Sequence, residues 1–267
     1  MRAGDFSMRP ATLRTWIEID SGAFRHNTEE FLKLISPKTH FMAVIKSNAY
    51  GHGLSLVGTI LKKYPRAWIG VDSITEALRI RHDGLTNSML VLGHTLPSRI
   101  EDARRAGIAI TVSQFETLAD LARMRTRPAF HLKIDTGMHR QGFLPEDFPR
   151  MIGMLRRAHL VPEGIYTHFA AAKDKKVPVY THMQTRVFKD AITMMNDAGF
   201  SRMITHAAAS GATLLFPETH FDMVRIGMGL YGYWPSAEAA ASYRRSRTKL
   251  KPVLTWKTVV GEVKKIP

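Results

Sequence analysis

The chain has 267 residues, no cysteine, and a formal net charge of +15 from 38 lysines and arginines against 23 acidic residues. The lack of cysteine excludes disulfide bonds and thiolate chemistry, and it fits a cytoplasmic protein. No apolar run approaches the roughly 20 residues that a membrane helix needs, so we expect no membrane segment. Residues 1–14 lack the apolar core of a secretory signal, and we predict that they form a flexible tail.

The excess positive charge could serve nucleic acid, an acidic membrane surface or anionic small molecules. Basic residues are spread along the chain, and the one dense run is 244–251. We interpret this run as a solvated connector. Nucleic-acid binding through it is the less favoured alternative, and it predicts an affinity that falls with salt.

Short apolar runs alternate with longer amphipathic stretches, which predicts alternating strands and helices. A strand-like run at 15–20 precedes a predicted helix at 21–34. Eight apolar runs then predict strands at 41–45, 67–71, 89–92, 109–112, 130–135, 164–169, 203–207 and 223–226. Amphipathic patterns between them predict helices at 73–82, 113–123, 149–158 and 183–198.

Eight strands joined by helices indicate an α/β fold, a (β/α)₈ TIM barrel. A doubly wound open sheet gives the same alternation, but the number of strands favours a closed barrel. We expect the barrel to occupy 15–235, although the strand at 15–20 would belong to a second, β-rich domain. Residues 236–267 hold the basic connector and a strand-like run at 253–263. Because two strands are too few for a stable domain, we interpret them as the remnant of a truncated C-terminal β-domain.

Active sites of such barrels lie at the C-terminal ends of the strands. Lys46 directly follows the predicted strand at 41–45 and opens the run Lys-Ser-Asn-Ala-Tyr-Gly-His-Gly. A lysine at the end of a buried strand loses solvation, and its amine becomes a nucleophile for a carbonyl cofactor. An isolated lysine would more often reach solvent. Here the glycines at 51 and 53 also let the backbone approach a ligand.

The run from Ala43 to Gly53 closely resembles the cofactor-lysine motif of alanine racemases. The resemblance implies that Lys46 carries pyridoxal 5'-phosphate covalently and is one of two catalytic bases. It also implies that Tyr50 helps to bind the phosphate group of the cofactor.

The strand predicted at 130–135 continues into a second similar motif, Lys-Ile-Asp-Thr-Gly-Met-His-Arg. Strand alternation puts Lys133 and Asp135 on one face, which we expect to point into the barrel. Without the resemblance, a buried ion pair would be the simplest interpretation. The resemblance implies that Arg140 contacts the phenolic oxygen of the cofactor, and that Lys133, often carbamylated in the family, holds Arg140.

Two histidines follow the later strands, and a single histidine at a strand end is more often part of the core. By resemblance, His168 lies beside the cofactor ring, and His206 binds the arginine that faces the ring nitrogen. Ser210, in a turn of small residues before a predicted helix, matches the serine that binds phosphate. The residue before this serine is usually asparagine in the family but is Ala209 here, which removes one hydrogen bond near the phosphate.

The eighth predicted strand leads into Gly227, Met228, Gly229 and Gly232. Their G-x-G-x-x-G spacing is not a dinucleotide fingerprint, because Pro235 ends any helix that could follow. The loop after strand eight of a barrel often binds phosphate, so we expect Gly227 and Met228 to contact the cofactor. Arg225 resembles the arginine that faces the pyridine nitrogen. An arginine keeps its charge, so that nitrogen stays largely unprotonated, which favours racemisation over transamination.

The resemblance covers residues 15–267 and predicts an alanine racemase that supplies D-alanine for the cell wall. The catalytic residues are expected to be Lys46, Arg140, His168 and Arg225, with no metal. The family's second base is a tyrosine in the C-terminal β-domain that reaches the partner subunit of a homodimer. No tyrosine follows the connector, so we expect impaired turnover. The alternatives are a free-standing barrel for cofactor binding or homeostasis, and a decarboxylase of the same barrel type.

Overall fold

The structure is a computed structural model that describes residues 13–173, 178–244 and 249–267. The tail predicted at 1–14 falls almost wholly outside these residues. So does half of the basic run at 244–251. No helix in the described part of the chain is both long enough and apolar enough to cross a membrane.

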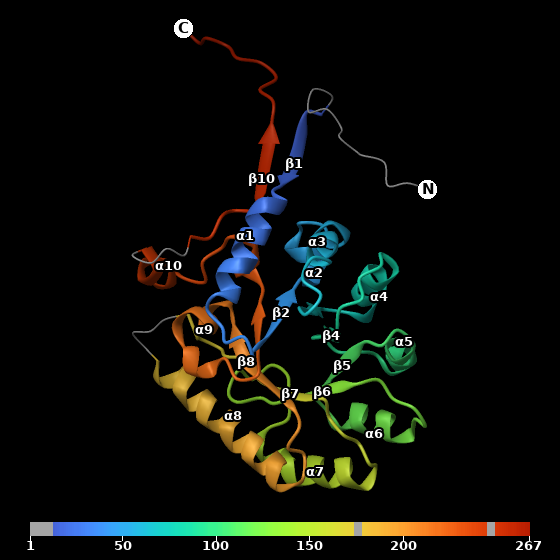
Figure 1. Cartoon of the computed structure of the whole chain (residues 1–267). Coiled ribbons are helices and arrows are strands. Elements are labelled where there is room, and N and C mark those ends of the chain that lie inside the picture. Colours follow the sequence, from blue (N-terminus) through green and yellow to red (C-terminus); the bar gives the residue numbers. More distant parts are fainter. Residues whose placement is uncertain (1–12, 174–177, 245–248) are drawn as a thin grey trace.

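Eight parallel strands form a closed barrel in the order β2-β3-β4-β5-β6-β7-β8-β9, which confirms the predicted TIM barrel. Helices surround the barrel, as Figure 1 shows. The barrel strands are β2 (His40–Val44), β3 (Trp68–Val71), β4 (Met89–Val91), β5 (Ala109–Val112), β6 (Phe130–Lys133), β7 (Gly164–Tyr166), β8 (Ile204–Ala209) and β9 (Met223–Ile226). The α-helices are α1 (Ser21–Leu32), α3 (Leu54–Leu61), α4 (Ile74–His82), α5 (Ile100–Arg105), α6 (Phe115–Arg123), α7 (Phe148–Arg157), α8 (Val179–Asp197), α9 (Ser210–Leu215) and α10 (Ala237–Arg244). Short 3₁₀ turns are η2 (Pro97–Arg99), η3 (Pro145–Asp147), η4 (Pro217–Thr219) and η5 (Met228–Tyr231).

Helix α8 begins four residues before its predicted start. The expected start at Met183 followed the apolar periodicity, which Thr181 interrupts just before it; Gln184 is a second polar residue near this end of the helix. Both residues are buried, and Gln184 donates to the Thr136 hydroxyl and accepts from the Ala170 amide. A polar side chain with hydrogen-bond partners can therefore occupy the buried face of a helix, and hydrophobic periodicity does not detect it.

Strand β6 ends at Lys133, two residues before the predicted end. Asp135 has left the strand, and its carboxylate accepts the backbone N–H groups of residues 137–140. Strand β7 likewise ends at Tyr166 instead of 169. These chain segments turn into loops at the C-terminal end of the barrel, where they can point side chains into a site.

Strands β1 (Thr15–Ile19) and β10 (Leu254–Thr258) form a separate antiparallel sheet of two strands. This sheet extends away from the barrel (Figure 1), and it contains both strand-like runs that the sequence predicts outside the barrel. Strand β10 is shorter than the predicted run at 253–263, because its five residues pair with the five residues of β1. Trp256 is 76% exposed on this ribbon and Ile17 is 54% exposed.

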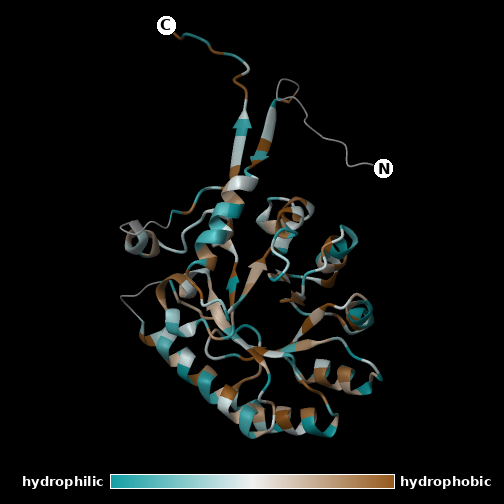
Figure 2. Cartoon of the chain, viewed as in Figure 1, coloured by the Kyte–Doolittle hydropathy of each residue, from teal (hydrophilic) through white to brown (hydrophobic). Residues whose placement is uncertain are grey.

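The apolar core lies mainly between the barrel and its helices. Figure 2 shows hydrophilic and hydrophobic colours side by side on outer helices such as α8, and mostly pale to hydrophobic colours along the barrel strands. A smaller apolar cluster with Met42, Trp68 and Met223 fills part of the barrel interior. The rest of the interior is polar, and it is lined from β6, β7, β8 and β9.

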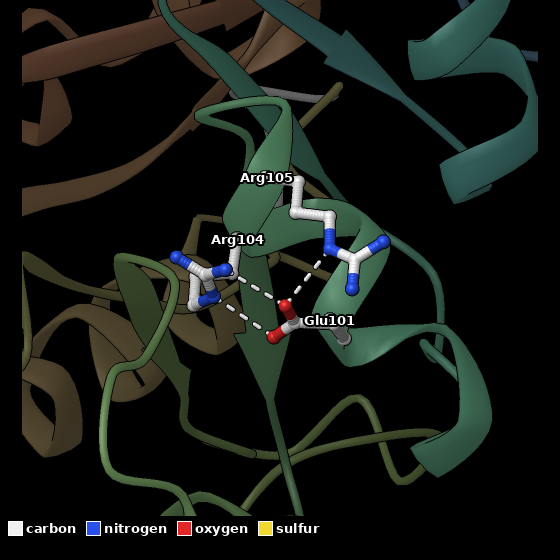
Figure 3. A network of polar contacts seen from close by, with 3 residues as sticks. All are labelled: Glu101, Arg104 and Arg105. Atoms are coloured by element: carbon white, nitrogen blue, oxygen red, sulfur yellow. Dashed lines mark hydrogen bonds and ion pairs between the residues drawn. The ribbon is translucent and has the colours of Figure 1, made fainter.

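Charged side chains on the outer helices pair locally. On α5, Glu101 accepts hydrogen bonds from Arg104 at 2.8 and 2.7 Å and from Arg105 at 2.9 Å (Figure 3). These bonds lower the pKa of Glu101 to about 2. Exposed pairs of this kind contribute little to stability, and this cluster lies outside the polar barrel interior.

Candidate functional site

A cavity of about 590 Å³ opens at the C-terminal ends of the barrel strands. Eight of the nine residues predicted to bind a cofactor line this cavity: Lys46, Tyr50, Arg140, His168, Ser210, Arg225, Gly227 and Met228. The ninth, His206, is fully buried behind Arg225. The barrel therefore brings together residues that are up to 182 positions apart, from 46 to 228.

Lys46 begins a left-handed turn, labelled α2 (Lys46–Tyr50) in Figure 1. The next four residues, 47–50, have positive φ angles of 52–55° without being glycine. Such a backbone costs on the order of 1–2 kcal/mol per residue, and the surroundings must hold it in place. The carboxylate of Glu76 accepts the Asn48 N–H at 2.8 Å, and the Asn48 side chain accepts the Leu54 N–H at 2.8 Å.

The same turn places Tyr50 over Gly227. A Cβ atom at position 227 would lie 2.8 Å from the Tyr50 hydroxyl oxygen, so Tyr50 keeps this position only beside a glycine and would have to shift beside any other residue. Beside it, Ser210 Oγ accepts the N–H groups of Gly227 at 3.1 Å and Gly229 at 3.3 Å. Hydroxyl and backbone N–H groups thus gather on one side of the cavity. Ala209 caps α9 without a side-chain hydrogen bond.

Lys133 is buried at the base of the cavity, and its Nζ lies 4.3 Å from the centre of the Tyr166 ring. Burial lowers the pKa of Lys133 well below its usual value, and the charges of Arg225 and Arg140 lower it further. Asp135 does not form the ion pair considered from the sequence, because its carboxylate is bonded to backbone N–H groups.

Arg225 lies at the bottom of the cavity and is only 3% exposed. Its Nη2 donates to the carbonyl oxygens of Thr167 at 2.7 Å and Ala207 at 2.8 Å, and its Nη1 donates to Nδ1 of His206 at 2.9 Å. Burial lowers the pKa of Arg225 to about 10. The guanidinium therefore remains charged at neutral pH.

His168 lies next to Arg225, with its Nδ1 3.3 Å from Nη2. Burial, followed by the charge of Arg225, lowers the pKa of His168 well below its usual value. The imidazole is therefore neutral at neutral pH, and it offers a hydrogen-bonding surface to a ligand without adding positive charge.

The structure adds residues that sequence reasoning did not assign to the site. Asp72 follows β3 and forms an ion pair with Lys46, with 3.2 Å between Oδ1 and Nζ. Tyr166 lines the cavity, and its ring stacks on His206 at a centroid distance of 4.6 Å. Tyr166 stands two residues before His168, so the alternation along the chain could have identified it. No sequence pattern pointed to Asp72, because its contact with Lys46 depends on how the neighbouring strands are aligned.

Comparison with known proteins identifies the family. The model of the alanine racemase N-terminal domain matches residues 19–235. Alanine racemase of Leptospira interrogans serovar Lai is 36% identical over 272 residues, which cover 100% of this chain and 70% of that protein. Alanine racemase of Desulforamulus reducens is 35% identical over 257 residues, covering 94% of this chain and 68% of the relative.

Solved structures agree with the sequence comparison. Alanine racemase of Clostridium difficile 630 superposes with a TM-score of 0.86 at 30% identity, covering 95% of this chain and 67% of the other. The same protein in complex with cycloserine gives a TM-score of 0.87 at 30% identity, covering 95% and 70%. This chain thus spans about 70% of the length of the Leptospira relative. The match of the family model over most of the chain, together with these relatives, shows that the chain belongs to the alanine racemase family.

Proposed function

We propose that this chain binds pyridoxal 5'-phosphate on Lys46 and interconverts L- and D-alanine by removing and returning the α-proton. The observation that supports this most strongly is that Lys46, Tyr50, Ser210 and Arg225 come from different elements and line one cavity. D-alanine for the cell wall is the physiological product that follows from the proposal. Alanine as substrate rests on the names of the relatives.

The residues around the cavity fit this cofactor. Gly227 leaves room for the Tyr50 hydroxyl, which a Cβ atom would meet at 2.8 Å. The Ser210 hydroxyl lies beside it and is a suitable donor for a phosphate group, and the N–H groups of Gly227 and Gly229 donate to its oxygen and hold it in place. We propose that these groups hold the phosphate, with Met228 in the same loop, and that Arg140 holds the phenolic oxygen.

Bound pyridoxal phosphate supplies an electron sink that makes the α-proton of an amino acid acidic. We assign the removal and return of that proton to the Lys46 amine. Arg225 donates hydrogen bonds and stays charged, so it does not hand a proton to the ring nitrogen. His168 packs beside Arg225 as a neutral imidazole. This arrangement favours return of the proton to the α-carbon.

Lys46 can serve one face of the substrate, and we assign no residue of the described cavity to the opposite face. We therefore propose that the 267-residue chain exchanges the α-proton of D-alanine faster than it racemises it. A homodimer, as the family resemblance implies, is part of the same proposal.

The first test uses the purified chain with pyridoxal phosphate, borohydride reduction and peptide mapping. We expect a visible absorption band, and label on Lys46. Lys173 also lines the cavity, so Lys173→Ala is the matched control and should keep the band, while Lys46→Ala should lose it. Label spread over several lysines would contradict the proposed cofactor site.

The second test separates racemisation from cofactor storage, because a free-standing cofactor-binding barrel would also show the band. Incubation with D-alanine in deuterated water should bring deuterium to the α-carbon, as measured by mass spectrometry. Lys46→Ala should abolish this exchange. A band without any exchange would favour the storage function over the racemase.

A further inference from the structure

A continuous line of hydrogen bonds crosses the inside of the barrel from Arg225 to Glu163. Arg225 Nη1 lies 2.9 Å from Nδ1 of His206, and Nε2 of His206 lies 2.8 Å from Nδ1 of His131. Nε2 of His131 lies 3.3 Å from Oε2 of Glu163. Both histidines are fully buried. Neither His131 nor Glu163 lines the cavity, so the line extends beyond the site described above.

The direction of these bonds follows from the groups at the two ends. A guanidinium has only donors, so Nδ1 of His206 must accept and carry no hydrogen. His206 then holds its hydrogen on Nε2 and donates it to Nδ1 of His131. His131 in turn holds its hydrogen on Nε2 and donates it to Glu163, whose carboxylate has only acceptors. Arg225 and Glu163 thus require the same tautomer at both histidines.

The packing between strands β6 and β7 leaves space for these hydrogen-bonded side chains. His131 in β6 pairs with Gly164 in β7, and a Cβ atom at 164 would lie 2.4 Å from His131 Nδ1. Glycine at this position therefore leaves the room through which His131 reaches His206. Glu163 precedes β7 at its N-terminal end, whereas the cavity opens at the C-terminal ends of the strands. The line therefore joins opposite ends of the barrel.

We infer that Glu163 and His131 are positioning residues that fix the tautomer of His206 and, through it, the placement of Arg225 in the cavity. The effect on a bound cofactor rests on the proposed function, because it assumes that Arg225 faces the cofactor ring. The tautomers themselves do not depend on that assumption.

Removal of the carboxylate leaves the His131 Nε2–H without its acceptor inside the barrel. Within the barrel the ring regains a partner when its hydrogen moves to Nδ1, and this shift also changes the tautomer of His206. A hydrogen on Nδ1 of His206 would then face an N–H of Arg225, which displaces the guanidinium. Glu163→Gln keeps an acceptor oxygen without the charge, whereas Glu163→Leu removes the acceptor at similar size.

The test is ¹⁵N NMR of the cofactor-free chain with labelled histidine and arginine. In the wild-type protein we expect His131 and His206 to be neutral, with hydrogen on Nε2 and none on Nδ1. Glu163→Gln should retain this pattern. Glu163→Leu should add a second tautomer at both rings and shift the side-chain N–H signals of Arg225.

The control is Glu218→Leu, which removes the partner of the exposed His182, 3.6 Å away. It should leave the signals of His131, His206 and Arg225 unchanged. If Glu163→Leu does not fold, His131→Phe leaves His206 Nε2 without an acceptor, and mixed tautomers are again expected at His206. Wild-type tautomers and unchanged Arg225 signals in Glu163→Leu, or in His131→Phe, would overturn the inference.

The same variants loaded with pyridoxal phosphate keep this inference apart from the proposed function. If wild-type protein shows no absorption band but the tautomers respond to Glu163→Leu, the proposed function fails and the inference stands. If the band forms, Glu163→Leu should shift its wavelength and Glu163→Gln should not. A band of unchanged wavelength in Glu163→Leu would overturn the link between Glu163 and the cavity.

Discussion

Lys46 and Asp72 form an ion pair inside the cavity, with 3.2 Å between the lysine Nζ and the carboxylate Oδ1. The two side chains come from the ends of neighbouring parallel strands, β2 and β3. Their side chains are 38% and 53% exposed, so water screens the attraction, and its contribution is about 0–1 kcal/mol. The pair holds the amine of Lys46 at the position where the cofactor would attach.

This ion pair must break before Lys46 can attack a carbonyl group. We expect Asp72→Asn to speed covalent attachment of pyridoxal phosphate at pH 7 by up to about fivefold, the equivalent of 1 kcal/mol. The rate is measured from the growth of the absorption band. Asp83→Asn, on the outer surface beside His82, is the control. Slower attachment in Asp72→Asn would instead mean that the carboxylate accepts a proton from Lys46 during the reaction.

Lys133 is expected to react with carbon dioxide. Burial and the charges of Arg225 and Arg140 lower the pKa of its amine well below the usual value, so a larger share of this amine is neutral at neutral pH than of an exposed lysine. A neutral amine attacks the carbon of carbon dioxide, forms an N–C bond and releases a proton, and the resulting carbamate can pair with Arg140. In ¹³C-bicarbonate, ¹³C NMR should show a carbamate signal that Lys133→Met removes.

Lys62→Met is the control for this experiment, because the Lys62 ammonium donates to a backbone carbonyl at the surface. The carbamate signal should persist in this variant. A signal that survives Lys133→Met would assign the carbamate to another amine, and the complete lack of a signal in the wild-type protein would contradict the prediction.

Gly227 is expected to be intolerant of a side chain. In Gly227→Ala the added Cβ would lie 2.8 Å from the Tyr50 hydroxyl oxygen, so the tyrosine must move away from its place beside Ser210. Loss of one hydrogen bond to a charged phosphate costs about 1.5–3 kcal/mol, which predicts at least about tenfold weaker binding of pyridoxal phosphate. Equilibrium dialysis measures this affinity. At Gly261 a Cβ would meet nothing, so Gly261→Ala should bind as the wild-type protein does.

Stability should fall as the pH drops below about 6.5, the usual pKa of histidine. Burial, the largest cause, lowers the pKa values of His131 and His206 in the folded chain. The unfolded state then binds more protons in this range, so stability rises with pH. Each histidine contributes up to about 1.4 kcal/mol per pH unit.

Urea unfolding between pH 5 and pH 7 measures this slope. His206→Asn removes one of the histidines with a lowered pKa and should reduce, but not abolish, the histidine part of the slope. His182→Gln, which replaces an exposed imidazole, should leave the slope unchanged. A free energy of unfolding that is constant from pH 6.5 to pH 5 would show that the buried rings do not stay neutral.

Much of the fold was predictable from the sequence. The apolar runs at 109–112 and 223–226 coincide with β5 and β9, and all eight predicted barrel strands are present. The reason is that strands enclosed between a packed interior and a layer of helices need continuous apolar residues. The predicted boundaries were wrong where polar residues are buried, as with Thr181 in the first turn of α8 and Asp135 after β6.

The main members of the candidate site were also predictable, because Lys46, Arg140 and Arg225 lie within or beside short motifs at the ends of strands. His131 was part of the same sequence run but received no role. The alternation that puts Lys133 inside the barrel also puts His131 on that face, so the signal was present. No sequence pattern singled out its partner Glu163, because an acidic residue just before a strand is usually a solvated surface residue.

The sequence by itself determined the closed barrel, because its strands and helices depend on local patterns of polarity, and the resemblance of its motifs to those of alanine racemases indicated the residues that meet at the C-terminal end of the barrel. Only the tertiary structure decided that Asp72 faces Lys46, that Tyr50 lies over Gly227, and that His206, His131 and Glu163 continue the line from Arg225. These relationships depend on the register between neighbouring strands. Register is set by the packing of the whole barrel, which no single segment of the chain encodes.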